Sequence, residues 1–146
     1  MMQRPNDDVG DFEDLVIERF RMAEQFIHDA KLSQMNGSYN TAADRAYYSI
    51  FKSLSALHTI DGYSFRSHKS LLGSFNKNYI HTGLFPKEYG GRVYDVQNLR
   101  HISDYGDFQF PTNAEVEDAI MCATEVMYIA KKYCQSKMTK IIDNEI

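Results

Sequence analysis

Arg100 and Asp104 are the charged residues whose spacing points most directly to chemistry. They lie four residues apart, and on a helix they fall on the same side as the apolar residues Val93 and Val96. One interpretation is an ion pair that fixes the end of the helix and contributes roughly a few tenths of a kcal/mol. The other is a guanidinium held by Asp104 so that its planar fork can bind a phosphate. His101 lies about 100° away around the helix, so it need not share the site.

A second group of basic and aromatic residues is formed by Arg45, Tyr48 and Lys52. They are spaced by three and four residues, which places them on one face of a helix, opposite its alanines. Cations can bind the phosphates of a nucleotide or RNA strand while a ring stacks on a base. The alternative interpretation is a solvated face, or a contact with another helix or a second subunit.

A third group, Arg66, His68 and Lys69, surrounds the predicted start of a helix at the N-cap residue Ser67. Free backbone N–H groups and the helix dipole favour an anion at such a position. A capping turn with exposed charge explains the same residues. A nucleotide or RNA contact is therefore one of two interpretations of these residues.

Composition narrows the class of protein. The chain has 146 residues, 43% of them hydrophobic and 25% charged, which fits one globular domain. The net charge of -4 gives no global basic field, so any nucleic-acid binding must come from a local cluster. There is no apolar run long enough to cross a membrane, and the N-terminal segment is too polar for a signal peptide, so we expect a cytoplasmic protein without a membrane partner.

Signatures of cofactor and metal enzymes are missing from the sequence. There is no GxxxxGK[ST], HExxH or GxSxG motif, and no clustered Glu-x-x-His pairs, so we expect neither a cofactor nor a metal. Cys122 and Cys134 are twelve residues apart in one predicted helix. That spacing separates them by about 18 Å, beyond the roughly 7 Å limit for a disulfide, so they are predicted to be buried core residues.

Hydrophobic spacing predicts an all-α fold. Residues 1–10 show no periodicity and are predicted to be a disordered tail, and residues 11–142 form a single domain. Five helices are expected, over residues 11–36, 39–61, 67–80, 86–105 and 112–141. In the first of them Leu15, Arg19, Met22, Ala23, Phe26 and Ala30 share the predicted face. The economical architecture is an up-and-down four-helix bundle with one additional short helix.

These residues resemble the HEPN superfamily, specifically its small stand-alone branch, over about residues 12 to 135. The Arg-Ala-Tyr-Tyr stretch at 45–48 is the most specific element. The motifs that carry the resemblance are Gly37-x-Tyr39-x-x-Ala42-x-x-Arg45-Ala46-Tyr47-Tyr48-x-x-Phe51, His68-Lys69, Phe75, Tyr79, Thr82-Gly83 and Arg100-x-x-x-Asp104-Tyr105.

The resemblance implies a five-helix fold that pairs into a homodimer, with the active groups meeting in a cleft between the subunits. It also implies a neighbouring minimal nucleotidyltransferase as partner and a role in toxin–antitoxin pairs or other defence and stress systems. Several members of the superfamily are metal-independent RNases. In those members an Arg with a polar neighbour is followed, after four to six intervening residues, by a His.

Carried over to this chain, Arg100 matches the Arg and His101 its polar neighbour, but the His positions hold Tyr105, Gly106 and Asp107. An RNase needs a base for the 2′-hydroxyl proton and a cation for the pentavalent phosphorus. Tyr105, with an ordinary pKa near 10, is a weak substitute for the missing base.

Three hypotheses follow from this departure. In the first, the chain is a non-catalytic or weakly catalytic HEPN module that binds nucleotide, RNA or a nucleotidyltransferase partner through a cleft at Arg100. In the second, it is an endoribonuclease in which Arg100, His101 and Asp104 replace the usual pair. In the third, it is a purely structural dimerisation module. The hydroxyl of Tyr105 near Arg100 suggests a further hypothesis, that a nucleotidyltransferase partner modifies this residue.

Overall fold

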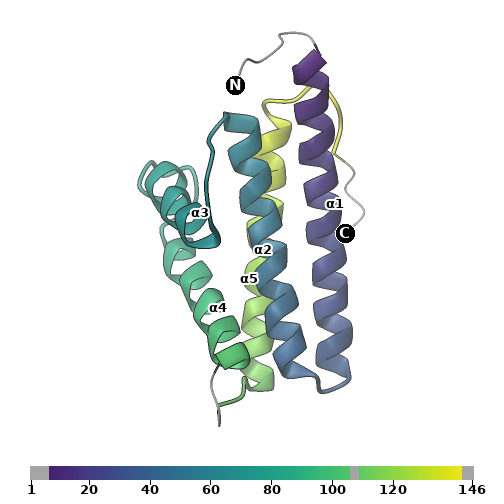
Figure 1. Ribbon diagram of the computed structural model, residues 1–146, viewed down its shortest axis with the longest axis vertical. Coiled ribbons are helices and arrows are strands. Elements are labelled where there is room, and N and C mark those ends of the chain that lie inside the picture. The colour runs from purple at the N-terminus through teal and green to yellow at the C-terminus, as the bar shows by residue number, and fades with distance from the viewer. Residues whose placement is uncertain (1–6, 106–108, 143–146) are drawn as a thin grey trace.

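The computed structural model describes residues 7–105 and 109–142, and these residues form a helical bundle (Figure 1). The elements in chain order are α1 (Asp7–Met35), α2 (Tyr39–Asp61), α3 (His68–Phe75), the π-helical turn η1 (Asn76–Ile80), α4 (Glu88–Tyr105) and α5 (Asn113–Gln135). Four long helices run up and down, and the short α3 lies beside them, as predicted. The predicted fold class is confirmed, and the described part of the chain contains no strand.

Helix α2 is the centre of the bundle and packs against α1, α3, α4 and α5. In Figure 1, α1 lies on one side of α2 while α3 and α4 lie on the other. The apolar stripe of α2 lies in the core: Ala42, Ala43, Ala46, Ile50, Leu54 and Leu57 are all fully buried. Tyr39, at the start of the same stripe, is partly buried. The small alanine side chains let neighbouring helices approach α2 closely.

The buried face of α1 matches the predicted one only in part. Ala23 and Ala30 are in the core as predicted, together with Val16, Phe20 and Ile27, whereas Leu15 is 39% exposed. Met22 and Phe26 are only partly buried. Apolar residues occur nearly all around this helix, so two overlapping faces fit the spacing and packing against the other helices decides between them. The helix also begins at Asp7, before the predicted start at Asp11; residues 1–6 of the predicted tail lie outside the described residues.

The predicted N-cap at Ser67 is confirmed, since its hydroxyl accepts the Ser70 N–H. The hydroxyl of Thr112 accepts the Glu115 N–H at the start of α5, and both caps are reciprocal capping boxes. Gly62 ends α2 with a φ of 75°, in the left-handed region that glycine occupies at no steric cost.

Helix α5 ends at Gln135 and does not continue to Ile141 as predicted. The chain instead turns across α1, where the buried carboxylate of Glu13 accepts the backbone N–H groups of Thr139 and Lys140 at 3.1 and 2.8 Å. The Gln135 side chain holds the same segment by bonding to the carbonyl of Lys140. These contacts replace the hydrogen bonds that a longer helix would have made, which is why the helix stops.

A cluster of polar groups ties α2, η1 and α5 together at the end of the bundle where α2 finishes. The Oδ2 atom of Asp61 accepts hydrogen bonds from the hydroxyls of Tyr79 and Tyr133 at 2.5 and 2.7 Å. Its Oδ1 atom binds the ammonium of Lys137 at 2.6 Å. The carboxylate side chain is only 10% exposed, so these bonds lie in a region of low dielectric.

Both cysteines are unpaired and buried, as predicted. Burial raises the pKa of each thiol to about 12, so neither Cys122 nor Cys134 is a reactive thiolate at neutral pH. Among the described helices, none is both long and apolar enough to pass through a lipid bilayer.

We expect the protein to lose stability as the pH falls below about 6.5, because His58 is buried in its neutral form. Its Nδ1–H donates to the Leu54 carbonyl at 2.7 Å, and its Nε2 accepts the Ser74 hydroxyl at 2.8 Å. Burial lowers the pKa of His58, although the Leu54 carbonyl and the charge of Asp61 act in the opposite direction. The unfolded chain therefore binds the proton more readily, and protonation favours unfolding.

Thermal unfolding recorded between pH 7.5 and 5 measures this effect. The midpoint temperature of the wild type should fall with pH more steeply than that of His58→Gln, which keeps a donor and an acceptor but does not titrate. The exposed His28 supplies the control, since His28→Gln should follow the wild-type curve. Equal slopes for the wild type and His58→Gln would contradict the prediction.

Candidate functional site

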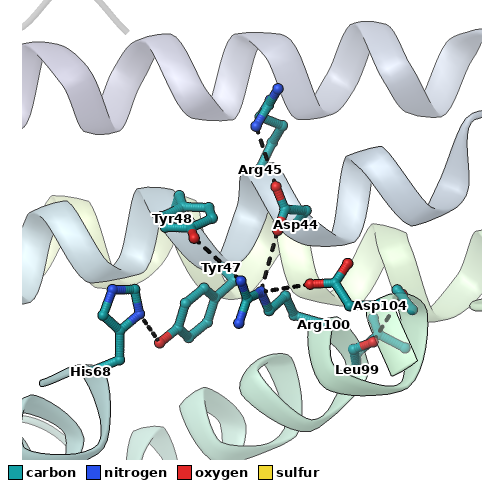
Figure 2. A network of polar contacts seen from close by, with 9 residues as sticks. Asp44, Arg45, Tyr47, Tyr48, His68, Leu99, Arg100 and Asp104 are labelled. Carbon is teal, nitrogen blue, oxygen red and sulfur yellow. Dashed lines mark hydrogen bonds and ion pairs between the residues drawn. The ribbon is translucent and has the colours of Figure 1, made fainter. Parts of the chain in front are cut away.

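Arg100 extends from α4 toward α2 and is held by groups from both helices (Figure 2). Its Nε lies 3.1 Å from Asp104 Oδ2 and 3.3 Å from Asp44 Oδ1. Its Nη2 donates to the hydroxyl of Tyr48 at 3.2 Å. The predicted pairing of Arg100 with Asp104 is therefore present, and α2 adds two further partners. The side chain is 25% exposed, so it is neither sealed in the core nor fully solvated.

The guanidinium uses one edge for these contacts and leaves the other open. Nε and Nη2 form the edge that faces Asp44, Asp104 and Tyr48. The two hydrogens of Nη1 have no hydrogen-bond partner among the described residues. Nη1 and the outer hydrogen of Nη2 together form the fork that binds two oxygens of a phosphate or carboxylate. Arg100 is thus oriented and still has donors for an anion.

Two aromatic rings lie against the guanidinium of Arg100. The carbon Cζ is 5.3 Å from the ring centroid of Tyr47 and 5.4 Å from that of Tyr48, which is within the range of a cation–π contact. Partial burial lowers the pKa of Arg100, but the hydrogen bond to Asp44 and the charges of its neighbours outweigh this, so its pKa is raised overall. The group stays a cation at every physiological pH.

Asp44 is a site residue that the spacing analysis missed. It stands one turn before Tyr48 on α2, so the face assigned to Arg45, Tyr48 and Lys52 includes it. Its Oδ1 holds Arg100, while its Oδ2 binds Arg45 Nη1 at 3.2 Å. Figure 2 shows Arg45 extending away from Arg100. Through its hydrogen bond with Arg100, Tyr48 connects the predicted group of Arg45, Tyr48 and Lys52 to the predicted pair of Arg100 and Asp104.

His68 joins the site through Tyr47, and this connection was not predicted either. The Nδ1 atom of His68 lies 2.7 Å from the Tyr47 hydroxyl. The imidazole stacks on the ring of Phe51 at 3.9 Å between centroids and lies 5.8 Å from that of Tyr48. Burial, followed by the charges of Arg100 and Lys52, lowers the pKa of His68. Its imidazole is therefore neutral at pH 7.

The other predicted site residues are arranged around this core. Lys52 is partly exposed on α2, and Arg66 and Lys69 are exposed on either side of His68. The Ser70 N–H at the start of α3 is already used by Ser67, which leaves less of the helix terminus for an anion than predicted. His101 is exposed on α4. The side chain of Tyr105 lies outside the described residues.

The two larger hollows in the protein surface both lie along α5. A groove of about 540 Å³ lies between α4 and α5, with Asp95, Leu99 and Asp118 among its lining residues. A second hollow of about 530 Å³ lies beside the end of α5 and includes Tyr128. Arg100 lines neither of them. Within the described part of the chain, no three His, Cys, Asp or Glu side chains are placed to hold a metal ion together.

The fold and these motifs define a HEPN protein: residues 16–133 match the HEPN domain, and the chain belongs to this family. The resemblance predicted from the sequence is confirmed. The chain is similar to a UPF0332 protein of Thermotoga maritima, with 34% identity over 100 residues that cover 68% of this chain and 76% of the relative. It is also similar to a protein of Methanocaldococcus jannaschii named "Putative toxin", with 31% identity over 99 residues that cover 68% of this chain and 73% of that relative.

Proposed function

We propose that this HEPN protein binds RNA through its phosphate backbone at Arg100 and is the toxin-type component of a defence or stress system. The observation that carries the proposal is the half-buried guanidinium of Arg100, which is fixed on one edge by Asp44, Asp104 and Tyr48 and has an open fork on the other. A planar fork with two parallel donors matches a phosphate group.

The charges around Arg100 favour a polyanion over a single small metabolite. Arg100 and four other cationic side chains lie in this region with the two carboxylates of Asp44 and Asp104, although the chain as a whole carries a charge of -4. The other four are Arg45, Lys52, Arg66 and Lys69. They are spread over α2, the start of α3 and α4, so a strand crossing these elements would meet successive cations.

The proposal includes the partners that the resemblance to the HEPN family implies. The protein acts in the cytoplasm as a homodimer and is paired with a minimal nucleotidyltransferase, which modifies the hydroxyl of Tyr105. The name of the Methanocaldococcus jannaschii relative supports the toxin role. Mass spectrometry of protein co-expressed with the nucleotidyltransferase measures the modification, and a mass without an added nucleotide would remove that part of the proposal.

Replacing Arg100 with alanine is expected to weaken RNA binding by about 10- to 100-fold, the range for losing a charged hydrogen-bonding pair. Fluorescence anisotropy with an end-labelled single-stranded RNA measures the dissociation constant. The slope of its logarithm against the logarithm of salt concentration should also fall by about one, since one phosphate contact is lost.

Arg92→Ala is the matched control for this experiment. Arg92 is on the same helix, is similarly exposed and pairs with a carboxylate, Glu125, at 2.7 Å, but it lines the groove toward α5. Its removal should leave RNA affinity within about twofold of the wild type. Equal losses in Arg92→Ala and Arg100→Ala, or no loss in either, would refute a specific role for Arg100.

A further inference from the structure

We infer that Arg19 on α1 is a second phosphate-binding residue, and that an RNA strand bound at Arg100 continues along the surface shared by α1 and α2 until it reaches Arg19. The inference rests on the proposed function, because it requires RNA to bind at Arg100. It also gives a role to an arginine that lies on the predicted apolar face of the first helix, where a charged side chain is unusual.

The first support is that Arg19 is a half-buried cation without a carboxylate partner among the described residues. Its contacts with α2 are uncharged: Nη1 donates to the backbone carbonyl of Ser55 at 3.3 Å and to the hydroxyl of Thr59. The neighbouring carboxylate of Glu18 pairs with Arg21 at 2.6 Å instead. Burial lowers the pKa of Arg19, but an arginine remains a cation at neutral pH. A cation partly withdrawn from water without a counter-ion favours an anion beside it.

The second support is that these contacts orient the guanidinium of Arg19 and leave one edge of it unused. Both contacts are made by Nη1, and the Nε and Nη2 groups have no hydrogen-bond partner in the part of the chain that the structure describes. Nε and Nη2 form a parallel pair of donors that can bind two oxygens of a phosphate. Arg19 therefore resembles Arg100 in having a fixed guanidinium with an open fork, although the groups that fix it are neutral.

The third support is that Arg19 and Arg100 contact the same stripe of α2. Arg100 bonds to the hydroxyl of Tyr48. Arg19 bonds to Ser55 and Thr59, which follow Tyr48 by seven and eleven positions and so lie on the same side of the helix. Helix α1 packs beside α2 along its length (Figure 1). A strand that leaves Arg100 can therefore reach Arg19 without passing to another side of the bundle.

The surface between the two arginines has the composition of a single-strand binding site. Lys52 lies one turn after Tyr48, on the part of α2 between the contacts of Arg100 and those of Arg19. Phe26, two turns from Arg19 on the same face of α1, packs against Tyr48 with 5.9 Å between the ring centroids. Both rings are partly exposed. Cations for the phosphates and rings for the bases are the two features that such sites combine.

The separation of the two arginines predicts the length of RNA that contacts both. Tyr48, which bonds to Arg100, and Thr59, which bonds to Arg19, are eleven positions apart on α2. At 1.5 Å per residue this is about 17 Å along the helix. A stacked strand rises about 3.4 Å per phosphate, so about five nucleotides cover the distance. An RNA of three nucleotides is therefore too short to contact both arginines, whereas one of eight is long enough.

The test compares the full chain with Arg19→Gln in binding end-labelled oligouridines of three and eight nucleotides, measured by fluorescence anisotropy. Glutamine can still donate to Ser55 and Thr59 but carries no charge. Arg19→Gln should bind the longer RNA about 10-fold more weakly than the wild type, as for one lost charged contact, and the shorter RNA equally well. The salt dependence for the longer RNA should also fall by about one phosphate contact. Arg100→Ala should weaken the binding of both.

Two further variants separate phosphate binding from a structural role. Arg21→Gln removes an exposed arginine on the far side of α1 and should bind both RNAs like the wild type. Thr59→Val removes a partner of Arg19 but keeps the cation, and its affinity for the longer RNA should stay within about threefold. Unfolding in urea verifies that each variant is folded.

Three results would overturn the inference and leave binding at Arg100 intact. They are no loss of affinity in Arg19→Gln, an equal loss for both RNA lengths, or a loss in Thr59→Val as large as that in Arg19→Gln. Absence of RNA binding by the wild type would overturn both the inference and the proposed function.

Discussion

Replacing Asp61 with alanine is expected to lower the free energy of unfolding by about 3 to 5 kcal/mol, the range for breaking a buried charged network. The carboxylate receives two tyrosine hydroxyls and one ammonium, which come from η1, α5 and the segment after α5. Removal leaves the hydroxyl of the fully buried Tyr79 with only the Leu57 carbonyl at 3.1 Å. Unfolding in urea, followed by circular dichroism, measures the difference.

The ion pair between Asp14 and Lys140 provides the comparison, because it has the same length of 2.6 Å but an exposed carboxylate. Asp14→Ala should change the free energy of unfolding by less than about 1 kcal/mol. Burial alone would raise the pKa of Asp61. Its hydrogen bonds to Lys137, Tyr79 and Tyr133 have a larger opposite effect, so the pKa of Asp61 lies below its ordinary value. The stabilisation is therefore present above about pH 4 and lost as the pH falls below that value. A variant as stable as Asp14→Ala would show that the network contributes nothing.

Phe20→Ala is expected to cost about 3 to 5 kcal/mol, whereas Leu15→Ala should cost less than about 1 kcal/mol. Phe20 is 1% exposed on the buried face of α1, and Leu15 is 39% exposed on the face that the sequence had favoured. Removing the Phe20 ring leaves a cavity in the core beside α1, while removing the Leu15 side chain mostly affects a surface that is already in contact with water.

Urea denaturation of both variants at the same pH measures the two costs. The slope of the free energy against urea concentration should match the wild type, which would show that both variants unfold from the same compact state. A larger cost for Leu15→Ala than for Phe20→Ala would mean that α1 packs on the face predicted from its sequence, and that the face described above is wrong.

The buried faces of α1 and α2 show which parts of the fold could be predicted from the sequence. In α2, alanines and large apolar residues occupy one stripe that its periodicity identifies, and this stripe is buried. The buried surface of α2 is wider than the stripe and also includes Tyr47 and His58, because α2 packs against four other elements. In α1 the apolar residues surround the helix, and only contact with α2 selects among them. Caps such as Thr112 with Glu115 depend on residues three apart in the chain, so local sequence determines them.

In the candidate site, the contact within one helix could be predicted from the sequence, and the contacts between helices could not. The pair of Arg100 and Asp104 lies within one helix and could be read from its spacing. The contacts of Arg100 with Asp44 and Tyr48 join residues more than fifty positions apart, and they exist only because α4 packs against α2. His68 enters the network because α3 folds back beside α2, a geometry that spacing along a helix does not encode.

The bond that Glu13 makes to the segment after α5 has a practical consequence for the experiments above. It gathers the beginning of α1 and the residues after α5 at one end of the bundle, while Arg100 lies near the end of α4 and the beginning of α2, at the opposite end. A fluorophore or a surface tether attached at the exposed Asp14 or Lys140 would therefore lie far from the proposed RNA-binding residue Arg100. Immobilised protein could report binding without steric interference from its own support.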